Sequence, residues 1–188
     1  MIDGSSLSLE GNIDITRKVV EFAHRYGVYV EAELGQLPSK TDLRARGLEG
    51  TVKAERTLGN LTTPEEAARF SVETGVDSLT ISIGTGHGVQ AKINFNLLKE
   101  IVEKTDAILV LHGGSGIPET ELRKAIQGGI SKVTFWTAMR KAFLKGLSDV
   151  LNEPSKQEYP IELLRSASLE MKDVMKKCMK VCGSSNKA

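Results

Sequence analysis

The regular alternation of strand-like and helix-like segments constrains the fold of this chain more than any other sequence feature. Five short apolar or β-branched segments are predicted to be strands, and amphipathic segments separate most of them. Such alternation predicts a parallel sheet whose strands are joined by right-handed helical crossovers. The predicted strands are Met1–Asp3, Val28–Leu34, Ser78–Ile83, Ala107–His112 and Lys132–Trp136.

The segments between these strands carry helix signals. Thr63 precedes Pro64, which is the favoured order of an N-terminal cap and a first helical residue, and Gly75 is a suitable stop. This pattern predicts a helix over residues 64–74. The other predicted helices are Ile13–Tyr26, Phe95–Lys104, Pro118–Gln127, Thr137–Leu151 and a C-terminal helix, Glu158–Cys182.

The number of strands indicates which kind of parallel sheet the chain builds. A (β/α)8 barrel takes about 250 residues, whereas this chain has 188 and supplies five strands. The chain also begins inside a predicted strand. We therefore expect an α/β fold of the parallel (β/α)8 TIM-barrel type, truncated at the N-terminus, with about five of the eight strands present. Residues 1–188 are expected to form a single domain, the C-terminal part of such a barrel.

Composition excludes several functional classes. The net charge is +1, which gives no support for a nucleic-acid or membrane-surface partner. No apolar run is long enough for a transmembrane helix, and the N-terminus does not resemble a signal peptide. The two cysteines, Cys178 and Cys182, have neither zinc-knuckle nor redox spacing. They are expected to be thiols in a reducing cytoplasm.

Two of the three histidines lie at or just after the ends of predicted strands. His87 follows the third strand in Ile-Gly-Thr-Gly-His-Gly, and His112 ends the fourth in Leu-His-Gly-Gly-Ser-Gly. The carboxyl ends of parallel strands meet at one edge, where active sites lie. Since imidazole is a standard zinc ligand, the pair predicts a metal site. His24, within a helix beside Arg25, is expected to be a solvated surface residue.

Glu31 and Glu33 are two residues apart on one strand and therefore face the same way. Buried carboxylates need a cation or hydrogen-bond donors. Two interpretations stay open: metal ligands or partners of a ligand histidine, or an ion pair with a lysine or arginine at the strand end. Glu33 is the preferred metal candidate because it lies nearer the carboxyl end of the strand.

Two glycine-rich or polar turns indicate an anion site. Residues 113–116 follow a strand and precede a helix, so that their backbone N–H groups and the helix dipole favour an anion. Residues 134–137 end the next predicted strand, again ahead of a helix. Phosphate sites after the last two strands are common in barrels. The long segment 35–61 is predicted to be a functional lid or a disordered loop.

Four motifs together resemble the class II fructose- and tagatose-bisphosphate aldolases: Met-Ile-Asp-Gly-Ser, Val-Glu-Ala-Glu-Leu-Gly and the two histidine motifs. The resemblance covers nearly the whole chain in the family's order. It implies a Zn²⁺-dependent, reversible cleavage of a phosphorylated ketose, a ketose 1,6-bisphosphate, to dihydroxyacetone phosphate and an aldehyde. The sequence does not distinguish fructose from tagatose bisphosphate.

The resemblance also implies roles for individual residues. His87 and His112 match two of the family's three zinc histidines, and Glu33 matches an acidic residue near the metal. Glu49 is the candidate for the family's catalytic glutamate. The positions matching the substrate-binding and phosphate-binding residues are Gly88, Gly113, Ser115, Thr134 and Thr137.

Some family features do not match. The third zinc histidine and the preceding catalytic aspartate belong to a strand upstream of Met1, and the family usually has asparagine where this chain has Thr134 and an acidic residue near Ala138. Three interpretations stay open. The missing strands belong to a longer chain or a complementary N-terminal chain, the protein is a catalytically inactive aldolase-like subunit with an assembly role, or an unrelated phosphate-binding barrel fragment has converged on these turns. A five-stranded fragment is expected to form a homo-oligomer or to bind a complementary chain.

Overall fold

The computed structural model describes residues 1–36, 60–85, 92–153 and 159–187. These residues divide into two compact units, Met1–Thr134 and Phe135–Ala188. The first unit holds the sheet and the helices that cover it, and the second is a pair of helices. The prediction that the chain forms a single domain is not tested by this division and stays a prediction.

The first unit is built on one sheet of five parallel strands. Their spatial order equals their order in the sequence, and every neighbouring pair is parallel. A doubly wound sheet would reverse its strand order at one point, whereas a barrel adds each strand beside the last. The observed order confirms the α/β barrel-type prediction. The strands are β1 (Ile2–Asp3), β2 (Glu31–Leu34), β3 (Ser78–Ile81), β4 (Ile108–Leu111) and β5 (Ile130–Val133).

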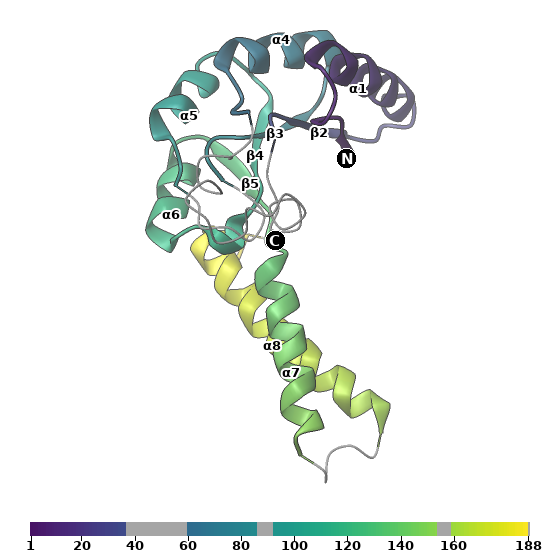
Figure 1. The fold of residues 1–188 in the computed structure, drawn as a ribbon, viewed down its shortest axis with the longest axis vertical. Coiled ribbons are helices and arrows are strands. Elements are labelled where there is room, and N and C mark those ends of the chain that lie inside the picture. The colour runs from purple at the N-terminus through teal and green to yellow at the C-terminus, as the bar shows by residue number, and fades with distance from the viewer. Residues whose placement is uncertain (37–59, 86–91, 154–158, 188) are drawn as a thin grey trace, which may run out of the picture. The chain divides into compact units, whose positions relative to one another are not determined.

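Helices cover the outer side of this sheet. Figure 1 shows them following one another in chain order along an arc outside the strands. Helix α1 packs on α4, and α4 packs on α5. All crossovers thus place their helices on one face, as in a barrel. The helices of this unit are α1 (Leu9–His24), α4 (Pro64–Thr74), α5 (Phe95–Val102) and α6 (Glu119–Gln127), with a 3₁₀ turn, η1 (Gly114–Gly116), before α6.

The apolar core lies between the sheet and these helices. Alternate residues of each strand point toward the helices, and the apolar ones among them are almost fully buried. The inner face carries polar residues of β2, β3 and β5, together with Val110 of β4. The core is lined by Ala32, Leu79, Ile81, Leu109 and Leu111 of the strands and by Ile13, Phe70, Leu98, Ile101 and Leu122 of the helices.

Helix boundaries follow local capping chemistry. Thr63 forms a capping box with Glu66, and Gly75 ends α4 with φ 65°. The predicted start of the first helix at Ile13 is too late. The Ser8 side chain accepts a hydrogen bond from the Gly11 amide, so α1 already begins at Leu9.

The last predicted strand, Lys132–Trp136, lies too far along the chain. Gly129 has φ 119°, which only glycine adopts easily, and this turn starts β5 at Ile130. The Thr134 amide still bonds the Leu111 carbonyl at 3.0 Å, but beyond it the chain enters the second unit. The apolar character of Phe135 and Trp136 therefore does not belong to the sheet.

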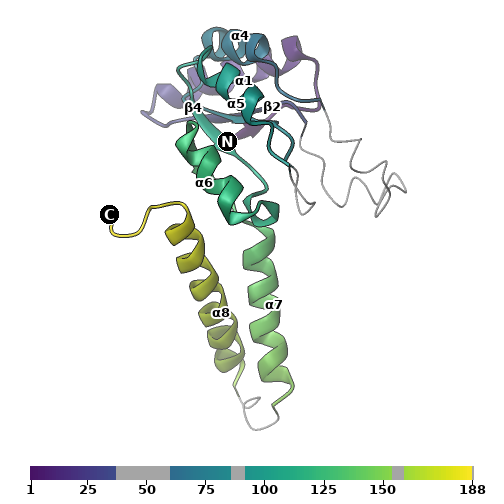
Figure 2. The same ribbon diagram turned by 90° about the vertical axis from the view of Figure 1, so that its left-hand side faces the viewer.

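The second unit is a helical hairpin of α7 (Thr137–Leu151) and α8 (Pro160–Val181). Both views show the two helices side by side along much of their length (Figures 1 and 2). Gly146 of α7 allows the closest approach: a Cβ atom there would lie 2.7 Å from the Ala167 Cα. The predicted C-terminal helix is thus present. Cys178 and Cys182, both on this segment, are half-buried.

No helix within the described parts of the chain combines the length and the apolar character needed to cross a membrane.

Candidate active site

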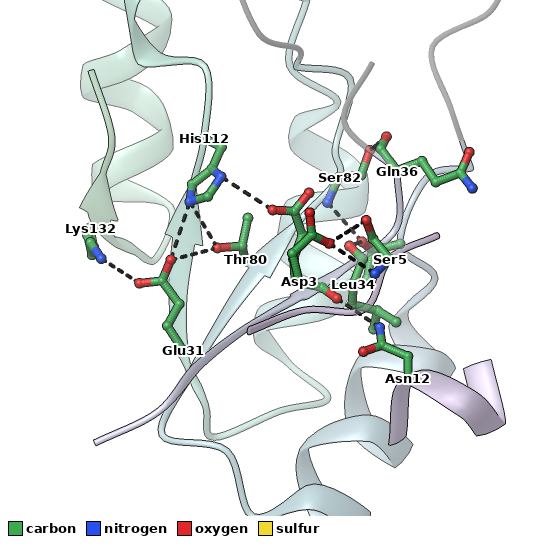
Figure 3. Close-up of polar contacts among 12 residues, drawn as sticks. Asp3, Ser5, Asn12, Glu31, Leu34, Gln36, Thr80, Ser82, His112 and Lys132 are labelled. Atoms are coloured by element: carbon green, nitrogen blue, oxygen red, sulfur yellow. Dashed lines mark hydrogen bonds and ion pairs between the residues drawn. The ribbon is translucent and has the colours of Figure 1, made fainter. Parts of the chain in front are cut away.

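A cluster of polar side chains occupies the inner face of the sheet in the first unit. Glu31 lies on β2, Thr80 on β3 and Lys132 on β5, while His112 directly follows β4. Inner-face positions alternate along β2 and β3, where the parallel register places Glu33 beside Thr80, and a register shift between β4 and β5 places Val110 beside Lys132. The four residues converge in Figure 3. Residues on or directly after four neighbouring strands thereby form one site.

His112 lies between two carboxylates. Its Nε2 atom is 3.3 Å from Glu31 Oε1, and its Nδ1 atom is 3.5 Å from Glu33 Oε2. The side chains of His112, Glu31 and Glu33 are all at least nine-tenths buried. Because β2 and β4 are separated only by β3, one imidazole ring spans the distance between both carboxylates. This arrangement is a buried carboxylate–histidine–carboxylate cluster.

Glu31 is compensated by a cation and a hydroxyl group. Its Oε2 atom pairs with the Lys132 ammonium, and its Oε1 atom accepts a hydrogen bond from Thr80 at 3.2 Å. Burial by itself would raise the pKa of Glu31. Lys132 and His112 outweigh that effect and lower the pKa below the ordinary value. Of the two interpretations left open for the carboxylates, the ion pair with lysine applies to Glu31.

Glu33 has the opposite electrostatic environment. Burial, with the negative charges of Asp3 and Glu31 adding to it, raises its pKa to about 7. Its strand position is also fixed, because the Asn12 side chain donates a 2.9 Å hydrogen bond to the Glu33 carbonyl. The backbone of Glu33 is thus held in place, and its buried carboxylate needs a cation when it is ionised.

The Asp-Gly-Ser motif at the N-terminus supports this region structurally. Asp3 Oδ1 accepts hydrogen bonds from the Ser5 amide at 3.0 Å and the Ser5 hydroxyl at 2.6 Å. Gly4 is buried where a Cβ atom would lie 2.3 Å from Asn12 Oδ1. Glycine therefore lets α1 approach β1 closely enough for Asn12 to reach Glu33.

The predicted phosphate turns meet at the ends of β4 and β5. Gly113 adopts φ 76°, and the Gly114 amide donates to the Thr134 carbonyl at 3.0 Å. The Gly116 amide bonds back to Gly113, so the amides of Gly114 and Gly116 are committed within the protein. The structure brings Gly113, Ser115 and Thr134 together. Thr137 opens α7 in the second unit.

Three predicted site residues, Glu49, His87 and Gly88, lie outside the described residues. Within the described ranges, no group of three or more His, Cys, Asp or Glu side chains is arranged to hold a metal ion. Zinc ligation by Glu33, His87 and His112, and the roles assigned to the other site residues, therefore stay predictions. His24 is exposed, as predicted, and its Nε2 atom lies 2.9 Å from Asp77 Oδ2.

Sequence reasoning did not single out Thr80, Lys132 or Asn12. Thr80 and Lys132 were treated as ordinary residues of predicted strands, although each interrupts an apolar pattern at an inner-face position. Polar residues that recur at aligned positions on neighbouring buried strands are the signal that could have found them. Asn12 had no such signal, because its role depends on the approach of α1 to β2.

Two solved structures that share this arrangement are aldolases. The YdjI aldolase of Escherichia coli K12 superposes with a TM-score of 0.79 at 30% identity, covering 99% of this chain and 60% of that one. A candidate fructose-1,6-bisphosphate aldolase of Coccidioides immitis gives a TM-score of 0.81 at 29% identity, covering 100% and 63%. The in-order sheet is therefore part of an aldolase-type α/β barrel.

The sequence comparisons are more specific. The family model described as fructose-bisphosphate aldolase class-II matches residues 1–187, so the chain belongs to the class II fructose-bisphosphate aldolase family. It is 38% identical over 186 residues to a D-tagatose-1,6-bisphosphate aldolase subunit, GatY, of Klebsiella oxytoca, covering 97% of this chain and 63% of that protein. The chain thus spans about three fifths of the length of these relatives.

Proposed function

We propose that this protein takes part in the metal-dependent, reversible cleavage of a ketose 1,6-bisphosphate, as fructose or tagatose bisphosphate, to dihydroxyacetone phosphate and an aldehyde. The observation that supports this most directly is the buried cluster of Glu31, Glu33 and His112. Burying two carboxylates beside one histidine is costly, and among the described residues only Glu31 of the two pairs with a lysine. A bound cation would explain why Glu33, the other carboxylate, is buried.

The geometry of His112 and Glu33 is compatible with zinc. Two ligand atoms on one tetrahedral zinc ion lie about 3.4 Å apart, given metal–ligand distances of about 2.0–2.2 Å. The observed separation of His112 Nδ1 and Glu33 Oε2 is 3.5 Å. His87 would supply a further ligand, as the resemblance implies. Bound zinc would polarise the ketone carbonyl and stabilise the charge that develops when the C–C bond breaks.

The turns at the ends of β4 and β5 would hold the substrate. Gly113 and Ser115 follow His112 directly, so a phosphate group there would fix a ketose with its carbonyl near the imidazole. Gly88 and Thr137 would complete the phosphate site, and Thr134 would contact the dihydroxyacetone part. Glu49 is the proposed proton-transferring carboxylate. We place the reaction in the cytoplasm.

A zinc titration tests the metal assignment. Calorimetry of the wild-type chain should show weak zinc binding, because His87 and His112 match only two of the three histidines that bind zinc in the family. His112→Ala should abolish that binding, whereas His24→Ala, on the exposed part of α1, should leave it unchanged. Tight stoichiometric binding that survives His112→Ala would remove the basis of the assignment.

A second candidate function is an inactive aldolase-like subunit. Thr134 and Ala138 stand where the family usually has asparagine and an acidic residue, and one relative is itself named a subunit. The two functions are separated by supplying the upstream segment of a related aldolase and measuring dihydroxyacetone phosphate release. Cleavage supports the enzyme. A soluble complex without cleavage supports the inactive subunit, and Thr134→Asn is then the first reversion to make.

A further inference from the structure

The cluster on the inner face contains a carboxylate that the proposed metal site does not use. Glu31 faces the Nε2 side of the His112 ring, whereas the proposed ligand Glu33 faces the Nδ1 side. Glu31 is itself held from two directions, by the Lys132 ammonium and by the Thr80 hydroxyl. A group with this many fixed partners constrains the ring that it contacts.

The hydrogen bonds around Nε2 determine which ring nitrogen carries the proton. The Thr80 hydroxyl donates its single hydrogen to Glu31 Oε1 at 3.2 Å, so toward the ring its oxygen can only accept. The ionised carboxylate of Glu31, paired with Lys132, also only accepts. Both atoms lie 3.3 Å from His112 Nε2. Two acceptors at 3.3 Å thus face Nε2, against one at 3.5 Å, Glu33 Oε2, on the Nδ1 side, so we expect the neutral ring to be protonated on Nε2 with its lone pair on Nδ1.

We propose that Glu31 is a positioning residue, which fixes His112 in the tautomer with Nε2 protonated and turns Nδ1 toward Glu33. This inference rests on the proposed function, since it names how a predicted zinc ligand is prepared. Lys132 keeps Glu31 in its accepting form, and Thr80 adds a second acceptor for the same hydrogen. Without them, the ring could carry its hydrogen on Nδ1, where it would block a metal ion.

The test measures the tautomer directly in the full 188-residue chain without metal. Nitrogen-15 NMR of the histidine rings, at a pH above the range in which histidine titrates, distinguishes the two tautomers. The His112 signals are assigned by their loss in His112→Ala. The wild type should show Nε2 protonated. Glu31→Gln and Lys132→Met should shift the population toward protonated Nδ1, and Thr80→Val should do so more than Thr80→Ser, which keeps the hydroxyl.

A matched control and an independent readout complete the design. Asp77→Asn removes the carboxylate of another histidine pair, so it should change the His24 signals and leave those of His112 unaltered. Zinc affinity should fall about 10- to 100-fold in Glu31→Gln, the usual effect of losing such a partner. Thermal unfolding identifies variants that do not fold. If Glu31→Gln does not fold, Lys132→Met tests the role of Glu31 instead, because the Lys132 side chain is more than half exposed.

The outcomes separate this inference from the proposed function. A wild-type His112 protonated on Nδ1 would overturn the positioning role, as would a tautomer that stays unchanged in folded Glu31→Gln and Lys132→Met. A tautomer that shifts as expected in a chain that binds no zinc would support the positioning role and contradict the metal function.

Discussion

At the scale of single residues, Glu33 determines how the protein should respond to pH. Its side chain is almost fully buried, and burial with the charges of Asp3 and Glu31 raises its pKa from 4.5 to about 7. In the unfolded chain the same carboxyl titrates near its ordinary value. Between these two pKa values the folded protein binds more protons than the unfolded chain, so that stability decreases as the pH rises.

Glu33→Gln should remove this pH dependence. In the metal-free wild type, the stabilising contribution is complete below about pH 4.5 and is lost as the pH rises through about 7, a decrease of roughly 3 kcal/mol. The neutral amide cannot titrate, so the variant should have a flatter profile. Urea unfolding at a series of pH values measures the free energy of unfolding of both proteins. Glu10→Gln, at the exposed pair with Arg69, should keep the wild-type decrease. Parallel profiles for wild type and Glu33→Gln would contradict the assignment.

The same residues show how far a sequence predicts such a site. The spacing of Glu31 and Glu33 was sufficient to place both on one face, and the strand ends were sufficient to place His112 there. The difference between the two carboxylates could not be predicted, because it depends on Lys132, which is 101 residues away from Glu31. Only the register of β2, β3, β4 and β5 brings these residues together.

At the scale of elements, the hairpin of α7 and α8 depends on one close contact. An added Cβ at Gly146 would lie 2.7 Å from the Ala167 Cα and 2.8 Å from the Ser166 carbonyl oxygen. Both are backbone atoms of the facing helix, so neither can move by a side-chain rotation. Glycine is usually unfavourable within a helix, and its presence here is explained by the approach of the two helices.

Gly146→Ala should therefore destabilise the protein in spite of its better helix propensity. The substitution gains about 1 kcal/mol in propensity, and overpacking costs about 1–3 kcal/mol, so a net loss of about 1 kcal/mol is expected. Gly11→Ala in α1 is the matched control. Its added Cβ meets only side-chain atoms, Ser8 Oγ at 3.3 Å and Leu7 Cβ at 3.4 Å, so it should not destabilise. Thermal unfolding compares the two. Equal stability of Gly146→Ala and wild type would mean that the helices separate without cost.

The elements themselves were largely predictable, and their ends were less so. Thr63 as a cap before Pro64 predicted the start of α4 correctly, because this signal is local. The end of β5 was predicted incorrectly, since Phe135 and Trp136 have the composition of a strand but lie beyond the last ladder contact of Thr134. Where a strand ends depends on the neighbouring strand, and no local pattern records that.

At the scale of the whole molecule, the sheet of the first unit has two edge strands, each paired on one side only among the described residues. Within the described residues, β1 has only β2 as a neighbour and β5 has only β4. Unpaired strand edges are templates for association. Large apolar side chains are also exposed near this edge: Phe22 of α1 and Tyr26, just beyond the end of α1, are 63% and 71% exposed, with their ring centroids 5.3 Å apart. The edge that begins at β1 therefore presents both a strand and an apolar helix face.

We expect the 188-residue chain to associate through this edge, with a second copy or with a complementary chain that supplies further strands. Sedimentation velocity over a range of concentrations should show species larger than the 20.4 kDa monomer. Phe22→Ser combined with Tyr26→Ser should reduce that association. Val72→Ser on α4, whose side chain is 85% exposed, is the control and should not. Adding the upstream segment of a related aldolase should replace self-association by one defined complex, because strands and a helix of that segment would cover the edge. A stable, cooperatively unfolding protein that stays monomeric at all concentrations would refute the argument that this sheet is an incomplete barrel.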